Sequence, residues 1–334
     1  MNSLEVKVLI LSKSEIEQLV SYKDVVKAVE ASYRAYGMGE VIQPQKDAMY
    51  VDGSKHQNFL ISMPAFVGTM NIAGLKLASV YDNQKPGYPT IGAIVILNDV
   101  ETGMPIAFMD GLSITNMRTA GHSAVAAKYL AKKNSSTVSL IGCGAEARTH
   151  LAALNELFSL KTIKVFDIRP EAMSAFKREM SERFPVDIVP TNSVSEAVEG
   201  SDIICCLTTS PKPVVFEYMV PVGCFVSGLM GFYDLDATIT KKADKWVLGH
   251  MESDKHLFVE DGLHVGNGIV MRPSMDDVYG DMGEIVTGKK PGRQNDKERI
   301  VYCHAGMGSH DLAVAKVAYT RAKEKGIGIE VKLI

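Results

Sequence analysis

Apolar and polar residues in the first third of the chain follow two periods, one typical of strands and one typical of helices. Residues 6–11 form a short apolar run that predicts a strand, and Ser12 with Glu15 behind it forms the capping-box pattern that begins a helix. Apolar residues at helical spacing predict a second helix over residues 24–36. Four extended segments follow: residues 58–63, 72–81, 92–97 and 104–109. Because no long helix separates these segments, we expect an antiparallel or mixed sheet.

From about residue 115 the pattern changes to a regular alternation of strands and helices. After an alanine-rich helix over residues 117–131, apolar strands alternate with helices as far as residue 207. Such an alternation predicts a parallel sheet covered on both faces, so the fold class is α/β with a mixed α+β first domain. A closing helix over residues 311–325 ends at Gly326, and we expect it to pack back on the first domain.

The strongest local signal for function is a glycine loop after the strand predicted over residues 137–141. Gly142, Gly144 and Ala147 form a Gly-x-Gly-x-x-Ala string between that strand and a helix, the context of a dinucleotide-binding loop. Gly142 permits the tight turn, Gly144 lets the backbone approach a pyrophosphate, and Ala147 allows close packing of the helix on the sheet. Free N–H groups at the helix start, where Ala145 and Glu146 lie, favour anions. The sequence thus predicts a Rossmann-type NAD-binding domain.

The next predicted strand ends in an acid that favours NAD as the cofactor. Asp167 lies about twenty residues beyond the glycine loop, where a carboxylate accepts hydrogen bonds from ribose hydroxyls and repels a 2′-phosphate. Ile168 and Arg169 follow and are expected in the same site, although an arginine there can also accommodate the phosphate of NADP. Thr208 and Thr209 come directly after another predicted strand, so they are either cofactor contacts or the start of a polar loop.

Composition narrows the class of partner and the compartment. The chain of 334 residues has a net charge of −3, which gives no electrostatic reason to expect nucleic acid or a membrane as a partner. No apolar run reaches the roughly 18 residues of a membrane-spanning helix, and the N-terminus lacks the order of a signal peptide. The five cysteines form no Cys-x-x-Cys pair, so we expect free thiols in the cytoplasm. The eight histidines show no ligand spacing, so no metal is expected.

Short motifs follow one another between residues 74 and 131, ahead of the glycine loop, and they carry a resemblance that covers nearly the whole chain. They are Gly74-Leu75-Lys76, Pro89-Thr90-Ile91-Gly92, Leu97-Asn98-Asp99, Thr102-Gly103-Met104-Pro105, Met109-Asp110-Gly111, Thr115-Asn116-Met117-Arg118-Thr119-Ala120 and Ala124-Val125-Ala126-Ala127-Lys128-Tyr129-Leu130-Ala131. In this order they resemble the ornithine cyclodeaminase/mu-crystallin family. That family includes cyclodeaminases, archaeal-type alanine dehydrogenases and imino-acid reductases. The resemblance therefore implies the fold and the cofactor, but it does not single out the substrate.

The resemblance also implies roles for individual residues. It makes Lys76 and Arg118 the clamp on the substrate's α-carboxylate, which suits the two-pronged geometry of an arginine. It implies that Thr90 and Thr119 contact the cofactor, the latter at what we take as a helix start. Lys46 matches a basic position near the substrate or nicotinamide, with an ordinary solvated lysine as the alternative.

Three acidic positions of the family bear on the reaction. Asp311 matches a catalytic position, and its alternative role is the N-cap of the closing helix. Ile61 stands where ornithine cyclodeaminases usually carry a glutamate that meets the substrate's amino groups. They also carry a general-base aspartate late in the chain, whereas residues 227–234 here hold no acid before Asp234. The groups that would hold and deprotonate a diamine are therefore missing, which argues against cyclodeamination.

We therefore predict a homodimeric NAD-dependent oxidoreductase that interconverts a small amino acid and its imino or oxo form. Residues 1–115 with 311–334 would bind the substrate and form the dimer, and residues 116–310 would bind NAD. Lys76 is also a candidate for proton transfer if burial beside Arg118 lowers its pKa. The alternatives are an ornithine cyclodeaminase and a non-enzymatic, mu-crystallin-like protein that binds a dinucleotide and a small ligand.

Overall fold

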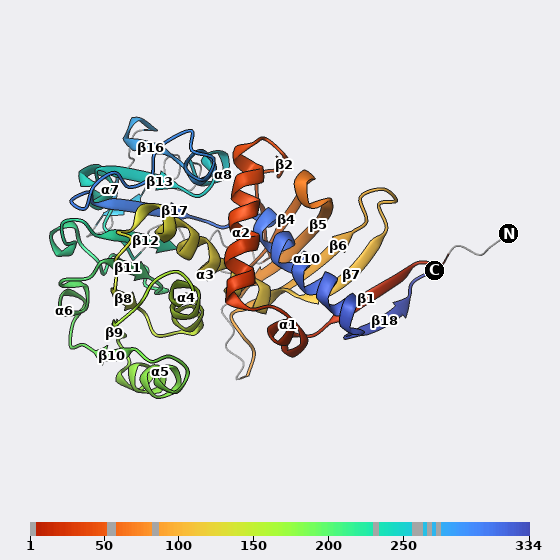
Figure 1. Cartoon of the computed structure of the whole chain (residues 1–334), viewed down its shortest axis with the longest axis horizontal. Helices are drawn as coiled ribbons and strands as arrows, with labels where there is room; N and C mark the ends of the chain where they lie inside the picture. Colours follow the sequence, from red (N-terminus) through yellow and green to blue (C-terminus); the bar gives the residue numbers. More distant parts are fainter. Residues whose placement is uncertain are drawn as a thin grey trace. The chain divides into compact units, whose positions relative to one another are not determined.

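The computed structural model describes residues 5–51, 58–81, 87–229, 234–255, 263–265, 269–271 and 275–334 (Figure 1). The chain forms two compact units, one made of Met1–Arg118 with Met307–Ile334 and the other of Thr119–Gly306. Each unit is built around its own eight-stranded sheet. One sheet is mixed and the other is parallel, so the predicted fold class is confirmed.

The sheet of the first unit has the strand order β18-β1-β7-β6-β5-β4-β2, and β3 pairs with β4. Its strands are β1 (Lys7–Leu11), β2 (Val41–Ile42), β3 (Asp47–Tyr50), β4 (Phe59–Val67), β5 (Ile72–Val80), β6 (Ile91–Asn98), β7 (Pro105–Asp110) and β18 (Ile329–Lys332). All neighbouring strands are antiparallel except β1 and β7, which are parallel. The expected mixed sheet is therefore present, with β2, β3 and β18 in addition to the predicted strands.

Helices α1 (Lys13–Leu19), α2 (Tyr22–Gly37) and α10 (Gly308–Lys325) pack together on one side of this sheet (Figure 1). The capping box predicted from Ser12 and Glu15 is present at α1. Helix α10 packs on β4, β5, β6 and α2, as expected of a closing helix that returns to the first domain. Gly74 permits this packing, because a Cβ there would lie 2.2 Å from the carbonyl oxygen of Ile96 and 3.1 Å from Leu312 Cδ2.

Helix α3 (Gly111–Leu130) begins directly after β7, earlier than the predicted start at residue 117. Asp110 begins it, because its Oδ2 accepts hydrogen bonds from the N–H of Ser113 at 2.8 Å and from the hydroxyl of the same residue at 2.6 Å. Most residues of α3 are buried, so no polar stripe marks its first turns in the sequence. Thr119 therefore lies inside the helix, and its expected place at a helix start is wrong.

The sheet of the second unit is parallel, in the order β10-β9-β8-β11-β12-β17-β13-β16. Its strands are β8 (Thr137–Ile141), β9 (Thr162–Phe166), β10 (Asp187–Pro190), β11 (Ile203–Cys206), β12 (Phe225–Leu229), β13 (Lys245–Leu248), β16 (Val278–Asp281) and β17 (Ile300–His304). From β8 the chain builds β9 and β10 on one side and then places β11 on the other side of β8. Ligands bind at such a switch point, at the carboxyl ends of the strands.

The remaining elements of the second unit are short apart from two helices. Its helices are α4 (Ala145–Asn155), α5 (Pro170–Arg183), α6 (Val194–Val198), α7 (Thr238–Lys242), α8 (Met251–Lys255) and α9 (Met282–Val286). Strands β14 (Leu263–Val265) and β15 (Ile269–Met271) form a separate hairpin, and single 3₁₀ turns lie at η1 (Gly68–Met70, in the first unit), η2 (Glu217–Met219) and η5 (Met275–Asp277). No helix among the described residues is both long and apolar enough to cross a membrane.

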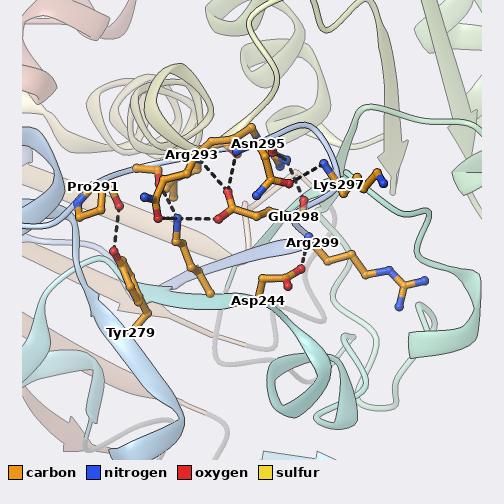
Figure 2. A network of polar contacts seen from close by, with 12 residues as sticks. Asp244, Tyr279, Pro291, Arg293, Asn295, Lys297, Glu298 and Arg299 are labelled. Atoms are coloured by element: carbon orange, nitrogen blue, oxygen red, sulfur yellow. Dashed lines mark hydrogen bonds and ion pairs between the residues drawn. The ribbon is translucent and has the colours of Figure 1, made fainter.

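A buried polar network at the amino ends of β13 and β17 holds the second unit together (Figure 2). Lys245 Nζ donates to Glu298 Oε1 at 2.8 Å and to the carbonyl oxygen of Gly292 at 2.6 Å. Arg293 Nε donates to the carbonyl oxygen of Leu130 at 2.7 Å, at the last residue of α3. The network thus fixes the last residue of α3 at the amino ends of the strands, on the side away from their carboxyl ends.

Candidate functional site

Three buried side chains of the first unit form an ion cluster, which we call the charged trio: Lys76, Arg118 and Asp311. Asp311 Oδ1 accepts hydrogen bonds from Lys76 Nζ at 3.1 Å and from Arg118 Nε at 2.9 Å. Asp311 Oδ2 lies 3.0 Å from the same Nζ, without hydrogen-bond geometry. The three side chains are only 2%, 8% and 0% exposed. Charges buried to this degree are tolerated only where they compensate one another.

Each member of the trio comes from a different element. Lys76 lies on β5 opposite Met63 of β4, and its side chain meets α10. Arg118 lies in α3 and Asp311 in the first turn of α10. The N-cap of α10 is Met307, so the interpretation of Asp311 as the N-cap is wrong. Because the helix begins before Asp311, the carboxylate is free to serve the trio while still lying near the positive end of the helix.

The N-cap residue Met307 makes no side-chain hydrogen bond to α10, and Gln43 from a distant segment supplies one instead. Its Oε1 accepts a hydrogen bond from the N–H of Ser309 at 3.0 Å, which satisfies one donor in the first turn of α10. No sequence pattern pointed to Gln43, although it lies close to Lys46 in the same short segment. No local pattern pairs a side chain with a helix that begins more than 250 residues later.

Burial lowers the pKa of Lys76 by removing water from its ammonium group, and the nearby charge of Arg118 lowers it further. Asp311 opposes both effects through its charge and its hydrogen bond, while Lys46 adds to the lowering. The resulting pKa of Lys76 is about 7. Lys46 is half-buried and lies within electrostatic range of the trio.

The charges of the trio suit an anion of single charge. With all three groups ionised, two positive charges and one negative charge leave the trio at +1. An arginine and a lysine in a dry place bind a carboxylate through charge-assisted hydrogen bonds. An amine with a pKa of about 7 can also accept or donate a proton near neutral pH.

The glycine loop of the second unit has the geometry of a dinucleotide turn. Gly142 has a φ of 100°, and a Cβ there would lie 2.8 Å from the carbonyl oxygen of Leu207, so only glycine fits. Gly144 is the N-cap of α4 without a side-chain cap, and a Cβ there would meet no atom within 4 Å. The first turn of α4, which begins at Ala145, therefore presents N–H groups beside open space, as a pyrophosphate requires. Ala147 is fully buried against the unit, as close helix–sheet packing demands.

Asp167 follows β9 and is held beside the glycine loop. Its Oδ2 accepts a hydrogen bond from the N–H of Cys143 at 2.9 Å, and its Oδ1 accepts one from the N–H of Arg169 at 2.9 Å. Ile168 is 88% exposed, which is unusual for an isoleucine and offers an apolar surface next to the acid. Both oxygens of the Asp167 carboxylate are thus held by backbone N–H groups at the carboxyl end of β9.

The predicted threonines lie in different surroundings. Thr208 follows β11 beside the glycine loop, since a Cβ on Gly142 would lie 3.2 Å from its backbone nitrogen. Thr209 comes next and is exposed. Thr119 is 8% exposed within α3. Thr90 belongs to the first unit, where it is exposed just before β6.

Comparison with known proteins gives the family. The model of the ornithine cyclodeaminase/mu-crystallin family matches residues 6–326. The chain belongs to this family. Alanine dehydrogenase of Archaeoglobus fulgidus is 36% identical over 329 residues, which cover 97% of this chain and 98% of that protein.

Two solved structures of the family share the fold closely. One is Δ1-pyrroline-2-carboxylate reductase of Thermococcus litoralis in complex with NADH and L-proline, with a TM-score of 0.88 and 33% identity over 97% of this chain and 100% of that chain. The other is an archaeal alanine dehydrogenase dimer with bound NAD, with a TM-score of 0.88 and 33% identity over 98% of this chain and 100% of that chain.

Two positions at which the sequence was compared with ornithine cyclodeaminases, Ile61 and Asp234, lie in the described residues. Ile61 pairs with Ala78 of β5, on the same face of the sheet as Lys76, so an apolar side chain lies on the trio's side of the sheet. Asp234 is buried, and burial raises its pKa to about 6 against the effect of its hydrogen bonds from Thr208. Residues 230–233, within the segment compared with the general-base aspartate, lie outside the described residues.

We predict that Lys76 makes the folded protein more stable as the pH rises above about 7. Between its pKa of about 7 in the folded chain and the ordinary lysine pKa of 10.5, the unfolded chain holds a proton that the folded chain does not hold. The free energy of unfolding therefore rises with pH through this window. Lys76→Met should flatten the rise in urea midpoints from about pH 7 to pH 10. The surface variant Lys13→Met is the control, and a Lys76→Met curve parallel to the wild-type curve would contradict the prediction.

Proposed function

We propose that this protein is an NAD-dependent oxidoreductase that interconverts a small amino acid and its imino or oxo form. The observation that carries the proposal is the charged trio, a buried cluster whose members come from the middle of β5, from α3 and from the first turn of α10. With all three groups ionised, the cluster has one positive charge in excess. The relatives named above, an alanine dehydrogenase and an imino-acid reductase, support the same class of reaction.

In the proposed site, Arg118 and Lys76 hold the α-carboxylate. When Lys76 is protonated, the combined charge of the two cations exceeds that of Asp311, and a carboxylate completes the balance of the trio. Asp311 keeps both cations in place before the substrate arrives, and Lys46 adds positive charge at the edge. Holding the carboxylate in this way fixes the position of the adjoining Cα, and such positioning supplies much of the rate of a two-substrate reaction.

Lys76 also serves the proposed reaction as the group that moves a proton. An amino acid at neutral pH carries an ammonium group, which must lose a proton before its nitrogen can form a double bond to Cα. The pKa of Lys76, about 7, allows its neutral amine to accept that proton near physiological pH. In the reverse direction the same ammonium returns the proton to the amine product.

The second unit would hold the dinucleotide. Gly142 and Gly144 form the turn, and the first turn of α4 at Ala145, Glu146 and Ala147 receives the pyrophosphate. Asp167 and Ile168, with Arg169 beside them, receive the adenosine, while Thr208, Thr209, Thr119 and Thr90 are the further proposed contacts. When bound, NAD supplies hydride transfer, and the chain supplies orientation and charge.

The substrate side chain is proposed to be small and apolar. Ile61, on the same sheet face as Lys76, offers no charge to a second amino group.

The five cysteines are all free and buried, which supports a reducing compartment such as the cytoplasm.

We predict that a panel of amino acids with NAD gives NADH formation with small apolar members such as alanine or proline. Absorbance of NADH follows the reaction, and NADP should be used less well because Asp167 repels the 2′-phosphate. Ornithine should give neither NADH at a comparable rate nor proline with release of ammonia. Proline formed from ornithine without stoichiometric NADH would establish a cyclodeaminase instead. Binding of NAD without turnover of any amino or imino acid would favour a binding protein.

We predict that Arg118→Lys lowers kcat/KM for the amino acid at least tenfold and leaves the affinity for NAD nearly unchanged. The lysine keeps the charge but loses the two-pronged geometry, and disrupting one partner of a desolvated charged pair costs about 2–5 kcal/mol. Arg321→Lys is the matched control, because Arg321 pairs with Asp24 near the surface of the same unit. An unchanged kcat/KM, or a loss of NAD binding as large as the loss of activity, would show that Arg118 is not the clamp.

We also propose a homodimer formed through the open face of the first unit's sheet. The face opposite Lys76 carries a row of apolar residues across six strands, made of Pro64, Leu75, Ile96, Phe108, Ile10 and Ile329. Ile10 is 42% exposed and Ile329 is 65% exposed. A continuous apolar face of this kind marks a protein interface, and the archaeal alanine dehydrogenase structure is a dimer.

We predict that Ile96→Glu converts the dimer to a monomer, because a charge in the middle of the row must be desolvated when two faces meet. Sedimentation velocity measures the change. Val222→Glu, which replaces an exposed apolar residue of the second unit, should leave the dimer intact. A monomeric wild-type protein, or a dimeric Ile96→Glu variant, would refute this interface.

A further inference from the structure

Asp234 fastens the loop that leaves β11 at both of its ends. Its Oδ2 accepts hydrogen bonds from the hydroxyl of Thr208 at 2.9 Å and from the N–H of the same residue at 3.1 Å. Its main-chain oxygen accepts a hydrogen bond from the N–H of Val214 at 2.8 Å. One residue from beyond β12 thus holds the beginning and the end of the loop over residues 208–214.

This loop is in backbone contact with the glycine turn. The position of a Cβ on Gly142 lies 3.0 Å from the carbonyl carbon of Leu207 and 3.2 Å from the nitrogen of Thr208. The N–H of Leu207 also donates to the carbonyl oxygen of Ile141 at 2.8 Å. The backbone at Thr208 therefore lies close beside the glycine turn, and only a glycine at position 142 leaves room for it.

The loop lies on the nicotinamide side of the proposed cofactor site. Asp167, for the adenosine ribose, follows β9, and Gly144, for the pyrophosphate, follows β8. The strand order β9-β8-β11-β12 then leaves the ends of β11 and β12 for the other half of the dinucleotide. Thr208 follows the first of these strands, and Asp234 follows the second after a short segment.

Asp234 is costly to keep as a carboxylate. It is 3% exposed, and none of the ion pairs formed by the described residues includes it. Burial raises its pKa to about 6, so at neutral pH it is ionised and its charge is met by the Thr208 donors. A hydrogen bond to a charged acceptor is stronger than one to a neutral acceptor, which suits a residue that must hold a loop firmly.

We propose that Asp234 is a positioning residue for the dinucleotide, which holds Thr208 against the glycine turn so that the loop over residues 208–214 forms the nicotinamide-side wall of the crevice. The inference rests on the proposed NAD site. It assigns no contact between Asp234 and the cofactor, because the carboxylate acts through Thr208.

The experiment measures the Kd of NAD by titration calorimetry for four variants with unchanged thermal unfolding. Asp234→Ala and Thr208→Val, which each remove one side of the hydrogen bond, should each raise the Kd about tenfold. Asp234→Asn and Thr208→Ser, which keep an acceptor and a donor, should stay within about threefold of the wild type. The double variant Asp234→Ala/Thr208→Val should bind no worse than Asp234→Ala, because both changes remove the same interaction. In kinetics, the KM for NAD should rise while the KM for the amino acid stays constant.

Asp167→Ala separates this inference from the proposed function. If the wild type binds NAD and Asp167→Ala weakens binding, the cofactor site is established independently of Asp234. A folded Asp234→Ala variant that then binds NAD like the wild type would overturn the inference, as would effects of Asp234→Ala and Thr208→Val that simply add. Wild-type protein that binds no NAD would instead overturn the proposed function and this inference together.

Discussion

The proposed role of the first unit depends on the burial of the charged trio. Lys76 and Arg118 lie 235 and 193 residues from Asp311 in the chain, so their contact exists only when β5, α3 and α10 are all in place. Replacing a buried ion cluster by well-packed apolar residues is often neutral or stabilising, so such a cluster is a poor device for stability alone. The excess positive charge of the cluster when Lys76 is protonated supports the proposed binding of a carboxylate.

The second unit depends on a different constraint, the close approach of backbones at the switch point of its parallel sheet. Gly142 touches the backbone at the end of β11, and Asp167 reaches back from β9 to the N–H of Cys143. The glycine turn is thus fixed from both neighbouring strands before any ligand binds. A rigid turn of this kind lowers the ordering cost that a dinucleotide would otherwise meet on binding.

Local patterns were sufficient for most of the fold and for the dinucleotide loop. The strand predicted over residues 137–141 is β8, and strands alternate with helices as far as β11, as predicted, because each apolar run and each cap lies within one element. The start of α3 was missed because a helix buried on all sides shows no helical alternation of apolar and polar residues. Thr119 was therefore misplaced as well. Strand β18 was missed because its partner is the first strand of the chain, and strand pairing over that distance leaves no local signal.

In the candidate site, too, local sequence patterns indicated single residues but not the contacts between distant elements. Lys76, Arg118 and Asp311 could be named one by one from motifs, but their contact could not, and the N-cap interpretation of Asp311 failed because α10 begins at Gly308. The link between Asp234 and Thr208 was also out of reach, since it joins two strand ends through side-chain geometry. Sequence patterns report which residue types are present at an element's end, whereas hydrogen bonds between elements appear only with the fold.

Arg118 and Asp311 shift the pKa of Lys76 in opposite directions, and this bears on the proposed reaction. Burial lowers the pKa of Lys76 most, Arg118 lowers it further and Asp311 raises it, and together these effects hold the amine near its midpoint at neutral pH. A bound carboxylate adds negative charge and would raise the pKa of Lys76, which favours the ammonium form and hinders proton uptake from the substrate. Arg118, by pairing with that same carboxylate, offsets part of the added charge. The arginine is therefore suited to two tasks in the proposed site: it orients the substrate, and it limits the change in the pKa of Lys76 that substrate binding brings.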